Sequence, residues 1–200
     1  MAFWRKKGKH ERGATLVEAA LITPVFFLLI FGILEMGLLY RDALTNSNAA
    51  KEGARSASVN GSSTSADYLI LRSIENGIGS IGIENLENIV VFKASGPNDT
   101  VPDACRTGSQ PGVCNRYDAA SFFRELNVAG TSTPTGNFGC RPGFSIDRHW
   151  CPSERNTTLG ASEYVGVHVE TRHDYITGFF GASTTLEDTN IIRLEPTEYS

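Results

Sequence analysis

Glu18 is the residue whose chemistry most constrains this sequence, because it is a carboxylate at the start of a long apolar run. No charged residue occurs from Ala19 to Leu34. An isolated charge is costly in apolar surroundings, so this carboxylate needs a cation nearby. Arg12 is one candidate. The other is the amine that a cut between Gly13 and Ala14 would create, four positions before Glu18 and about 6 Å from it along a helix axis.

The four cysteines could bind a metal or form disulfide bonds. They are Cys105, Cys114, Cys140 and Cys151, separated by eight, 25 and ten residues. None of these intervals is the two-residue spacing of structural zinc sites, so we predict no metal site. An even number of cysteines in loops rich in glycine and proline favours two disulfides, which need an oxidising compartment. Three pairings are possible. We favour the two local ones, Cys105–Cys114 and Cys140–Cys151, each of which closes a loop of about ten residues and contributes about 2–3 kcal/mol.

Two pairs of nearby residues could support acid–base catalysis or metal binding, namely Asp147 with His149 and His173 with Asp174. Such pairs are more often solvated loop residues than active-site groups. The sequence has no Gly-x-Ser-x-Gly elbow, phosphate-binding loop or His-Glu-x-x-His motif, and no glycine pattern that lies between a strand and a helix, as dinucleotide binding needs. We therefore expect a protein that is not an enzyme and has no cofactor. An anchored hydrolase would need a ligand-shaped pocket around His149 or His168.

The element that must position Glu18 is a membrane-spanning helix. Apolar character continues from Ala14 to Tyr40, a length of about 40 Å in a helix, and a hydrocarbon core is about 30 Å thick. Pro24 predicts a kink near Ala20, whose carbonyl it cannot bond. Glu35 would lie near the opposite interface, as a carboxylate that reaches to water. A cleaved secretory signal is the alternative, but no small-residue cleavage site follows the run promptly.

The distribution of charge predicts the orientation of this helix. Residues 1–13 contain five basic side chains and one acid, and the rest of the chain contains 13 Lys and Arg against 21 Asp and Glu. A basic leader suits the anionic cytoplasmic face of a membrane, which places residues 41–200 outside the cytoplasm. An acidic body argues against nucleic-acid binding. We therefore predict a single-pass protein of the cytoplasmic membrane, in contact with membrane lipid, whose C-terminal domain is periplasmic or extracellular.

One continuous stretch resembles a known family. Residues 12–40, RGATLVEAALITPVFFLLIFGILEMGLLY, are similar to the amino-terminal signature of the TadE-like family, the minor pseudopilins of tight-adherence (Flp-type) pili. Residues 48–58, NAAKEGARSAS, resemble the continuation of that signature, so the resemblance covers residues 12–59. The matching positions are Arg12-Gly13, Val17-Glu18, Ala20-Leu21, Pro24, Gly32-Ile33 and Glu35-Met36-Gly37.

The resemblance implies a type IV pilin-like subunit that is processed at the cytoplasmic edge of the membrane. By analogy, a prepilin peptidase would cut between Gly13 and Ala14. Glu18 would then set the axial register of the subunit through the terminal amine of a neighbour. The partners implied are the prepilin peptidase and other pilin or pseudopilin subunits.

Helical patterns predict an extension of the membrane helix and a second helix after it. The Ala-rich extension would end at VNGSS, residues 59–63. Thr64 and Asp67 resemble a capping box that opens the second helix, which would run to about Asn76. The buried stripe of the extension would be formed by Leu44, Ala50, Ala54 and Ala57. The buried face of the second helix would be formed by Tyr68, Leu71, Ile74 and Ile78.

Three later segments, residues 88–95, 162–172 and 184–195, predict an antiparallel three-stranded sheet with one face packed on the helices. Phe179 and Phe180 lie near the tip of the hairpin loop between the last two strands. We expect them in the buried core, with an exposed subunit contact as the alternative. Residues 96–160 form an irregular insertion that holds all four cysteines, with a short helix over 118–126. As a surface region, it is where we expect partner specificity.

These observations predict an α+β fold in which a single N-terminal transmembrane helix extends into a pilin-like head with a second helix and a small antiparallel sheet. The predicted division is a basic cytoplasmic leader (1–13), the helix and its extension (14–59), and an exported domain (60–200) that includes the disulfide-stapled insertion 96–160. The expected function is that of a minor pilin-like subunit in assembly of a tight-adherence type IV pilus or a related secretion apparatus. The alternative is a membrane-anchored extracytoplasmic binding module, an adhesin or a sensor.

Overall fold

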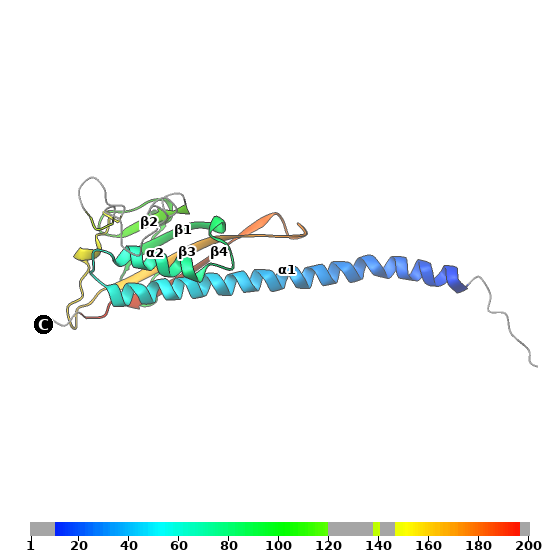
Figure 1. The fold of residues 1–200 in the computed structure, drawn as a ribbon, viewed down its shortest axis with the longest axis horizontal. Coiled ribbons are helices and arrows are strands. Elements are labelled where there is room, and N and C mark those ends of the chain that lie inside the picture. Colours follow the sequence, from blue (N-terminus) through cyan, green and yellow to red (C-terminus); the bar gives the residue numbers. More distant parts are fainter. Residues whose placement is uncertain (1–10, 120–137, 141–146, 197–200) are drawn as a thin grey trace, which may run out of the picture.

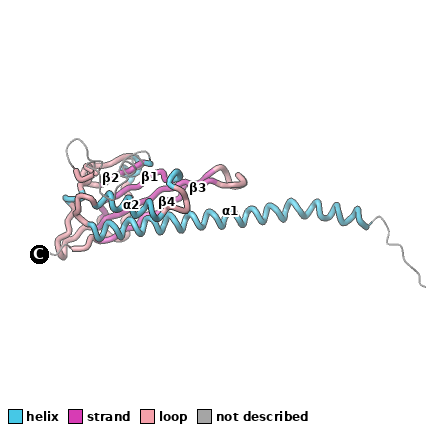
Figure 2. Tube along the Cα trace, viewed as in Figure 1, coloured by secondary structure: helices cyan, strands magenta, loops and turns pink. Residues whose placement is uncertain are grey.

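The computed structural model describes residues 11–119, 138–140 and 147–196. A single long helix, α1 (Glu11–Asn60), dominates the molecule. Its carboxyl-terminal half lies along an α+β head, and its amino-terminal half projects away from the head (Figures 1 and 2). The predicted fold class, α+β with a long apolar N-terminal helix and a small antiparallel sheet, is confirmed.

The helix α1 is continuous over 50 residues and contains Pro24. Figure 1 shows it bending gently in its blue amino-terminal part, the part in which this proline lies. The helix ends at Asn60, and Gly61 follows it with a φ of +41°. A left-handed conformation after the last helical residue suits glycine, which has no Cβ to clash with the backbone. The helix therefore ends within VNGSS, residues 59–63, where its end was predicted.

The second helix, α2 (Ala66–Gly77), runs back along α1 and packs closely against it. Small residues permit this contact. A Cβ on Gly53 would lie only 2.8 Å from the Cγ1 of Ile74, and one on Gly77 would lie 3.0 Å from the Cα of Ala49. The predicted alanines of the stripe and the predicted face of α2 are all buried. Leu44, which we placed on the same stripe, is 64% exposed.

The predicted capping box at the start of α2 is wrong. The helix begins at Ala66, and the residue at its N-cap, Ser65, makes no side-chain capping hydrogen bond. Asp67 is fully buried instead of lying at the surface of the first turn. Its carboxylate bonds to side chains from the insertion, and those interactions determine where it points.

The sheet has four antiparallel strands in the order β2-β1-β3-β4. We predicted three of them and missed β2, which the insertion contributes. The segment CNRYD is short and mostly polar, so it lacks the apolar alternation that marks a strand. The strands are β1 (Leu86–Ala94), β2 (Cys114–Asp118), β3 (Tyr164–Asp174) and β4 (Ser183–Arg193).

Both faces of the sheet are covered, by different parts of the chain. The face with Val91 and Val167 packs against α1 and α2 and forms the main core. The opposite face, with Val90 and Phe92, packs against Cys105 of the short helix α3 (Asp103–Thr107). Two 3-10 helices complete the described elements, η1 (Ile83–Asn85) and η2 (Pro152–Glu154). Most of the helix predicted over residues 118–126 lies outside the described residues.

Candidate functional site

The amino-terminal half of α1 presents an apolar surface that the head does not cover. Leu21, Ile22 and Phe26 are among its exposed side chains. This helix is long and apolar enough to cross a membrane, consistent with single-pass anchoring. So large an exposed apolar surface is not stable in water, and it needs either lipid or other helices around it.

Glu18 lies within this exposed half of α1. Its side chain is exposed, and within the described part of the chain it has no hydrogen-bond or ion-pair partner. Gly13 and Ala14 lie in the first turn of the same helix, one turn before Glu18. The structure thus places the predicted cleavage residues, the carboxylate and Pro24 on one continuous helix.

Glu35 behaves differently from the carboxylate that we predicted to reach toward water. It is only 2% exposed. Its two carboxylate oxygens accept hydrogen bonds from backbone N–H groups of the β3–β4 loop, from Thr177 at 2.5 Å and from Ile176 at 3.3 Å. The loop therefore satisfies the charge of Glu35 at this level of the helix. This contact could not be predicted from the sequence, because backbone donors 141 and 142 positions away have no sequence signature.

About two turns further along α1, a second polar contact joins the helix to β3. Asp42 is largely buried and lies 2.7 Å from the Nδ1 of His173. Arg41 donates to the other oxygen of Asp42 at 2.8 Å. His173 and Asp174, which could have formed an acid–base pair, do not pair with each other, since Asp174 pairs with Arg172 instead. His173 thus helps to hold the strand against the helix.

The β3–β4 hairpin extends beyond the head, alongside α1 and back toward its amino terminus (Figure 1). Phe179 and Phe180 lie at its tip with 63% and 51% of their surface exposed. We expected this pair in the core, and that prediction is wrong. The core cannot include them because β3 and β4 stay paired as far as Asp174 and Ser183, which carries the loop away from the sheet face that packs on the helices.

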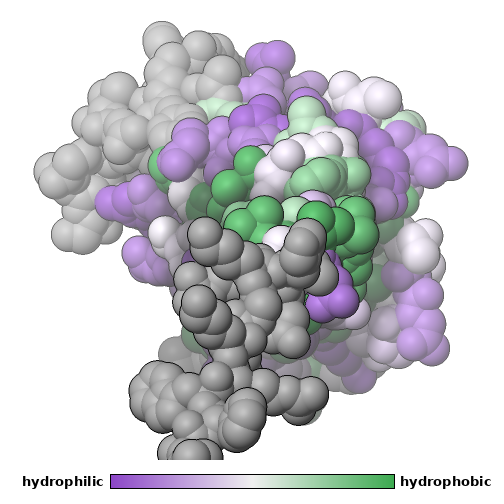
Figure 3. All heavy atoms as spheres, turned by 90° about the vertical axis from the view of Figure 1, so that its right-hand side faces the viewer, coloured by the Kyte–Doolittle hydropathy of each residue, from purple (hydrophilic) through white to green (hydrophobic). Residues whose placement is uncertain are grey.

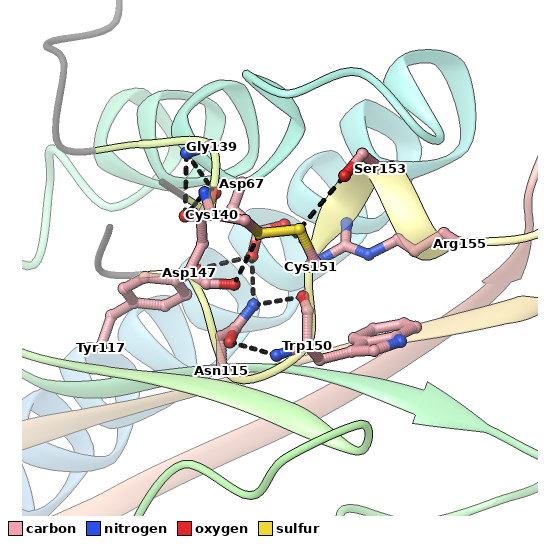
Figure 4. The surroundings of a disulfide bond; sticks show 10 residues. All are labelled: Asp67, Asn115, Tyr117, Gly139, Cys140, Asp147, Trp150, Cys151, Ser153 and Arg155. Carbon is pink, nitrogen blue, oxygen red and sulfur yellow. Dashed lines mark hydrogen bonds and ion pairs between the residues drawn. A yellow bond between two sulfur atoms is a disulfide. The ribbon is translucent and has the colours of Figure 1, made fainter. Parts of the chain in front are cut away.

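Both predicted local disulfides are present. Cys105 bonds to Cys114 beside the outer face of the sheet, and Cys140 bonds to Cys151 beside α2 (Figure 4). Within the described residues no group of His, Cys, Asp or Glu is arranged to hold a metal ion. The insertion is thus tied to itself at two points, one on each face of the sheet.

A buried polar cluster surrounds the Cys140–Cys151 bond (Figure 4). Asp67 of α2 is its centre, and it accepts hydrogen bonds from Arg155 at 2.5 Å, from Tyr117 at 2.6 Å and from Asn115 at 2.9 Å. The Arg155 guanidinium also lies 4.3 Å from the ring centre of Trp150, in a cation–π contact. The cluster joins α2, β2 and the end of the insertion.

Burial shifts the pKa of two groups in this cluster. Burial raises the pKa of Tyr117 well above its ordinary value, and the nearby Asp67 carboxylate raises it further. Asp147 also has a raised pKa, because it is buried and lies near Asp67, although the backbone N–H groups of Gly139 and Cys140 donate to it. Asp147 therefore caps backbone groups instead of forming an acid–base pair with His149. The cluster has the features of a structural core.

His168 also has a structural role, in the contact between β3 and β4. It is buried on β3, where its Nδ1 lies 2.8 Å from the hydroxyl of Thr189 on β4. Burial lowers the pKa of this imidazole, and the positive charge of Arg106 lowers it further. Two grooves of the described surface lie beside α1 and the hairpin tip, and no histidine lines either of them.

The geometry defines the class of this protein as an α+β protein with one candidate membrane-spanning helix, whose exposed half carries a carboxylate. The model of the family described as TadE-like protein matches residues 13–55, and this match confirms the resemblance that the sequence suggested. It points to a pseudopilin-type protein associated with a Tad pilus. No curated protein and no solved structure matches the chain.

Proposed function

We propose that this protein is a minor pilin-like subunit, a pseudopilin, that acts in the assembly of a tight-adherence pilus or a related secretion apparatus. The observation that carries the proposal is the position of Glu18. It is an exposed carboxylate with no described partner, on the apolar half of α1, inside the residues that match the TadE-like family. A second subunit can supply the missing cation.

In the proposed mechanism the prepilin peptidase cuts between Gly13 and Ala14 and leaves a positive amine on Ala14. The exposed halves of several α1 helices then pack side by side. The carboxylate of Glu18 pairs with the terminal amine of a neighbouring subunit. Because an unpaired charge costs several kcal/mol in apolar surroundings, only the axial register that brings the two charges together is stable.

The proposed orientation follows from the charge of the leader and from the two disulfides. The basic residues 1–13 stay in the cytoplasm, and residues 41–200 lie in the periplasm or outside the cell, where cysteines are oxidised. In this proposal the head has no catalytic role. It contacts other minor subunits, and the insertion 96–160 determines which ones.

The substitution Glu18→Gln tests the proposal, because it removes the charge and keeps the size of the side chain. We expect it to abolish recovery of the protein in sheared filaments while the amount in the membrane stays the same. Glu52→Gln is the matched control, since Glu52 is an exposed carboxylate on the part of α1 that lies along the head. This control should enter filaments normally.

Intact-mass measurement of the membrane form tests the processing step, with a chain that begins at Ala14 as the expected result. An uncut chain carrying Glu18→Gln that still entered filaments at the normal level would contradict the proposal. A wild-type protein that stayed in the membrane and never joined filaments would favour the anchored binding module.

A further inference from the structure

The tip of the β3–β4 hairpin is an apolar surface that neither the head nor α1 covers. Ile176, Phe179 and Phe180 are 78%, 63% and 51% exposed. No charged residue occurs from 175 to 186. Exposed aromatic side chains on a charge-free loop indicate a contact with an apolar partner. In Figure 3 this end of the molecule faces the viewer, and hydrophobic surface gathers near its centre.

The hairpin tip extends the apolar surface of the membrane helix, and two grooves lie between the tip and the helix. On one side, Phe179 and Phe180 line a groove of about 780 Å³ together with Leu28 and Gly32 of α1. On another side, Ile176 lines a groove of about 520 Å³ together with Phe31 and Leu34. Both grooves include Ile33 and Gly37 of α1, so the tip and the helix form one continuous apolar surface.

The structure also fixes the level at which the tip lies along α1. Glu35 accepts hydrogen bonds from the backbone N–H groups of Ile176 and Thr177, and His173 pairs with Asp42. The ring centres of Tyr175 and Phe180 lie 6.0 Å apart, and this contact helps to keep the loop compact. The charge-free run of α1 ends at Leu34, so the tip is held where this helix would leave the hydrocarbon.

We infer that the hairpin tip is a second membrane contact, which inserts Ile176, Phe179 and Phe180 into the outer leaflet of the bilayer beside α1. Its occupant is lipid, at the boundary between headgroups and acyl chains, where amphipathic and aromatic groups bind. The charge-free tip is continuous with the apolar surface of α1, at the level where the charge-free run of this helix ends, and this continuity favours lipid.

This contact also gives Glu35 a role. A carboxylate near the end of a membrane span is costly unless its charge is satisfied, and the loop supplies two N–H donors that hold it away from lipid. The same bonds dock the tip on the helix. The two membrane contacts together set the depth of α1 in the bilayer.

The inference rests on the proposed membrane position of α1, and fluorescence depth measurement can test the two separately. The full-length protein would be reconstituted at low density in vesicles of phosphatidylcholine and phosphatidylglycerol, with bromine atoms on the acyl chains as quenchers. Trp4→Phe provides the background, which leaves Trp150 as a buried internal reference. The probes are Phe180→Trp and Ile176→Trp, one for each groove.

Two matched controls use the same added indole elsewhere. Leu29→Trp lies on the exposed half of α1 and reports the helix, and Leu159→Trp lies on an exposed loop of the head. We expect quenching of both tip probes, strongest when the bromines are near the headgroups, since interfacial groups lie about 5–10 Å deep. The Leu29→Trp probe should be quenched most by bromines near the bilayer centre, and the Leu159→Trp probe by none.

Each other outcome overturns the inference in a recognisable way. If the bromolipids do not quench the tip probes but acrylamide in the water does, the tip lies outside the membrane. Tip probes that neither quencher reaches are covered by protein, which would assign the grooves to a second copy of the chain. Failure of the Leu29→Trp probe to respond would instead remove the membrane position of α1 itself, whatever the tip probes show.

Discussion

Two carboxylates near the ends of the charge-free run of α1 differ in burial and in hydrogen bonding. Glu18 is exposed and has no partner in the described chain, whereas Glu35 is buried under a loop that donates two backbone hydrogen bonds to it. They are about 25 Å apart along the helix axis, close to the thickness of a hydrocarbon core. Within the described residues the chain thus satisfies one charge and leaves the other unpaired, and under the proposed function a neighbouring subunit supplies the cation.

At the same scale, Asp67 holds the most irregular part of the head in place. Its carboxylate accepts hydrogen bonds from Arg155, Tyr117 and Asn115, and the Arg155 side chain is fully buried. Removing one partner of a buried ion pair leaves an uncompensated charge, which is more costly than losing a neutral hydrogen bond.

We therefore expect Asp67→Ala to lower the free energy of unfolding by about 3–5 kcal/mol, because it leaves the Arg155 guanidinium buried and unpaired. Tyr117→Phe is the control, since it removes one hydrogen bond to the same carboxylate and should cost about 1 kcal/mol. Urea unfolding of the detergent-solubilised protein, followed by near-UV circular dichroism, measures both values. Equal losses in the two variants would show that the ion pair does not stabilise the head.

At the scale of elements, the close contact of α1 with α2 is one of the contacts that join α1 to the head, beside those of α1 with β3 and β4. The contact depends on Gly53, whose missing side chain leaves room for Ile74 of α2 and Val167 of β3. The main core includes residues from both helices and from the sheet around this point. A larger residue here would have to push α2 or the sheet away.

We expect Gly53→Leu to lower the free energy of unfolding by about 1–3 kcal/mol through overpacking, although leucine is the better helix former. The neighbouring exposed substitution Glu52→Leu adds the same side chain to the same turn and should change stability by no more than about 0.5 kcal/mol. Thermal unfolding of the two variants side by side measures the difference. A Gly53→Leu protein as stable as the control would mean that the helices do not pack as the structure has them.

Elements whose apolar residues follow a regular pattern in the sequence could be predicted. Elements whose conformation depends on contacts with distant residues could not. The apolar run predicted α1, and the spacing of Tyr68, Leu71, Ile74 and Ile78 predicted the buried face of α2. The alternation of valines predicted β3. Strand β2 was missed because it is short and polar, and only its pairing with β1 makes it a strand.

The candidate site was predictable to a smaller extent, for the same reason. The types and spacing of Gly13, Glu18 and the cysteines are visible in the sequence. The docking of the hairpin on Glu35 depends on backbone N–H groups, which every residue except proline has. The exposure of Phe179 and Phe180 depends on how far β3 and β4 continue beyond the core.

At the scale of the whole molecule, the proposed orientation predicts the redox state of the cysteines. Full-length protein taken from membranes should resist alkylation by a polyethylene-glycol maleimide under denaturing conditions until it is reduced, and should then gain four adducts. The control is a chain without residues 1–40, which lacks the membrane helix and should stay in the cytoplasm with reduced thiols. Gel mobility reports both results. Immediate alkylation of the full-length chain would place the head in the cytoplasm.

The half of α1 beyond the membrane run lies lengthwise against α2, β3 and β4. A pull on the amino terminus along the helix axis would thus load these contacts in shear, all at the same time. Contacts loaded together resist force better than contacts that peel open in sequence. A subunit built in this way could be drawn out of a bilayer by its helix with the head still folded behind it.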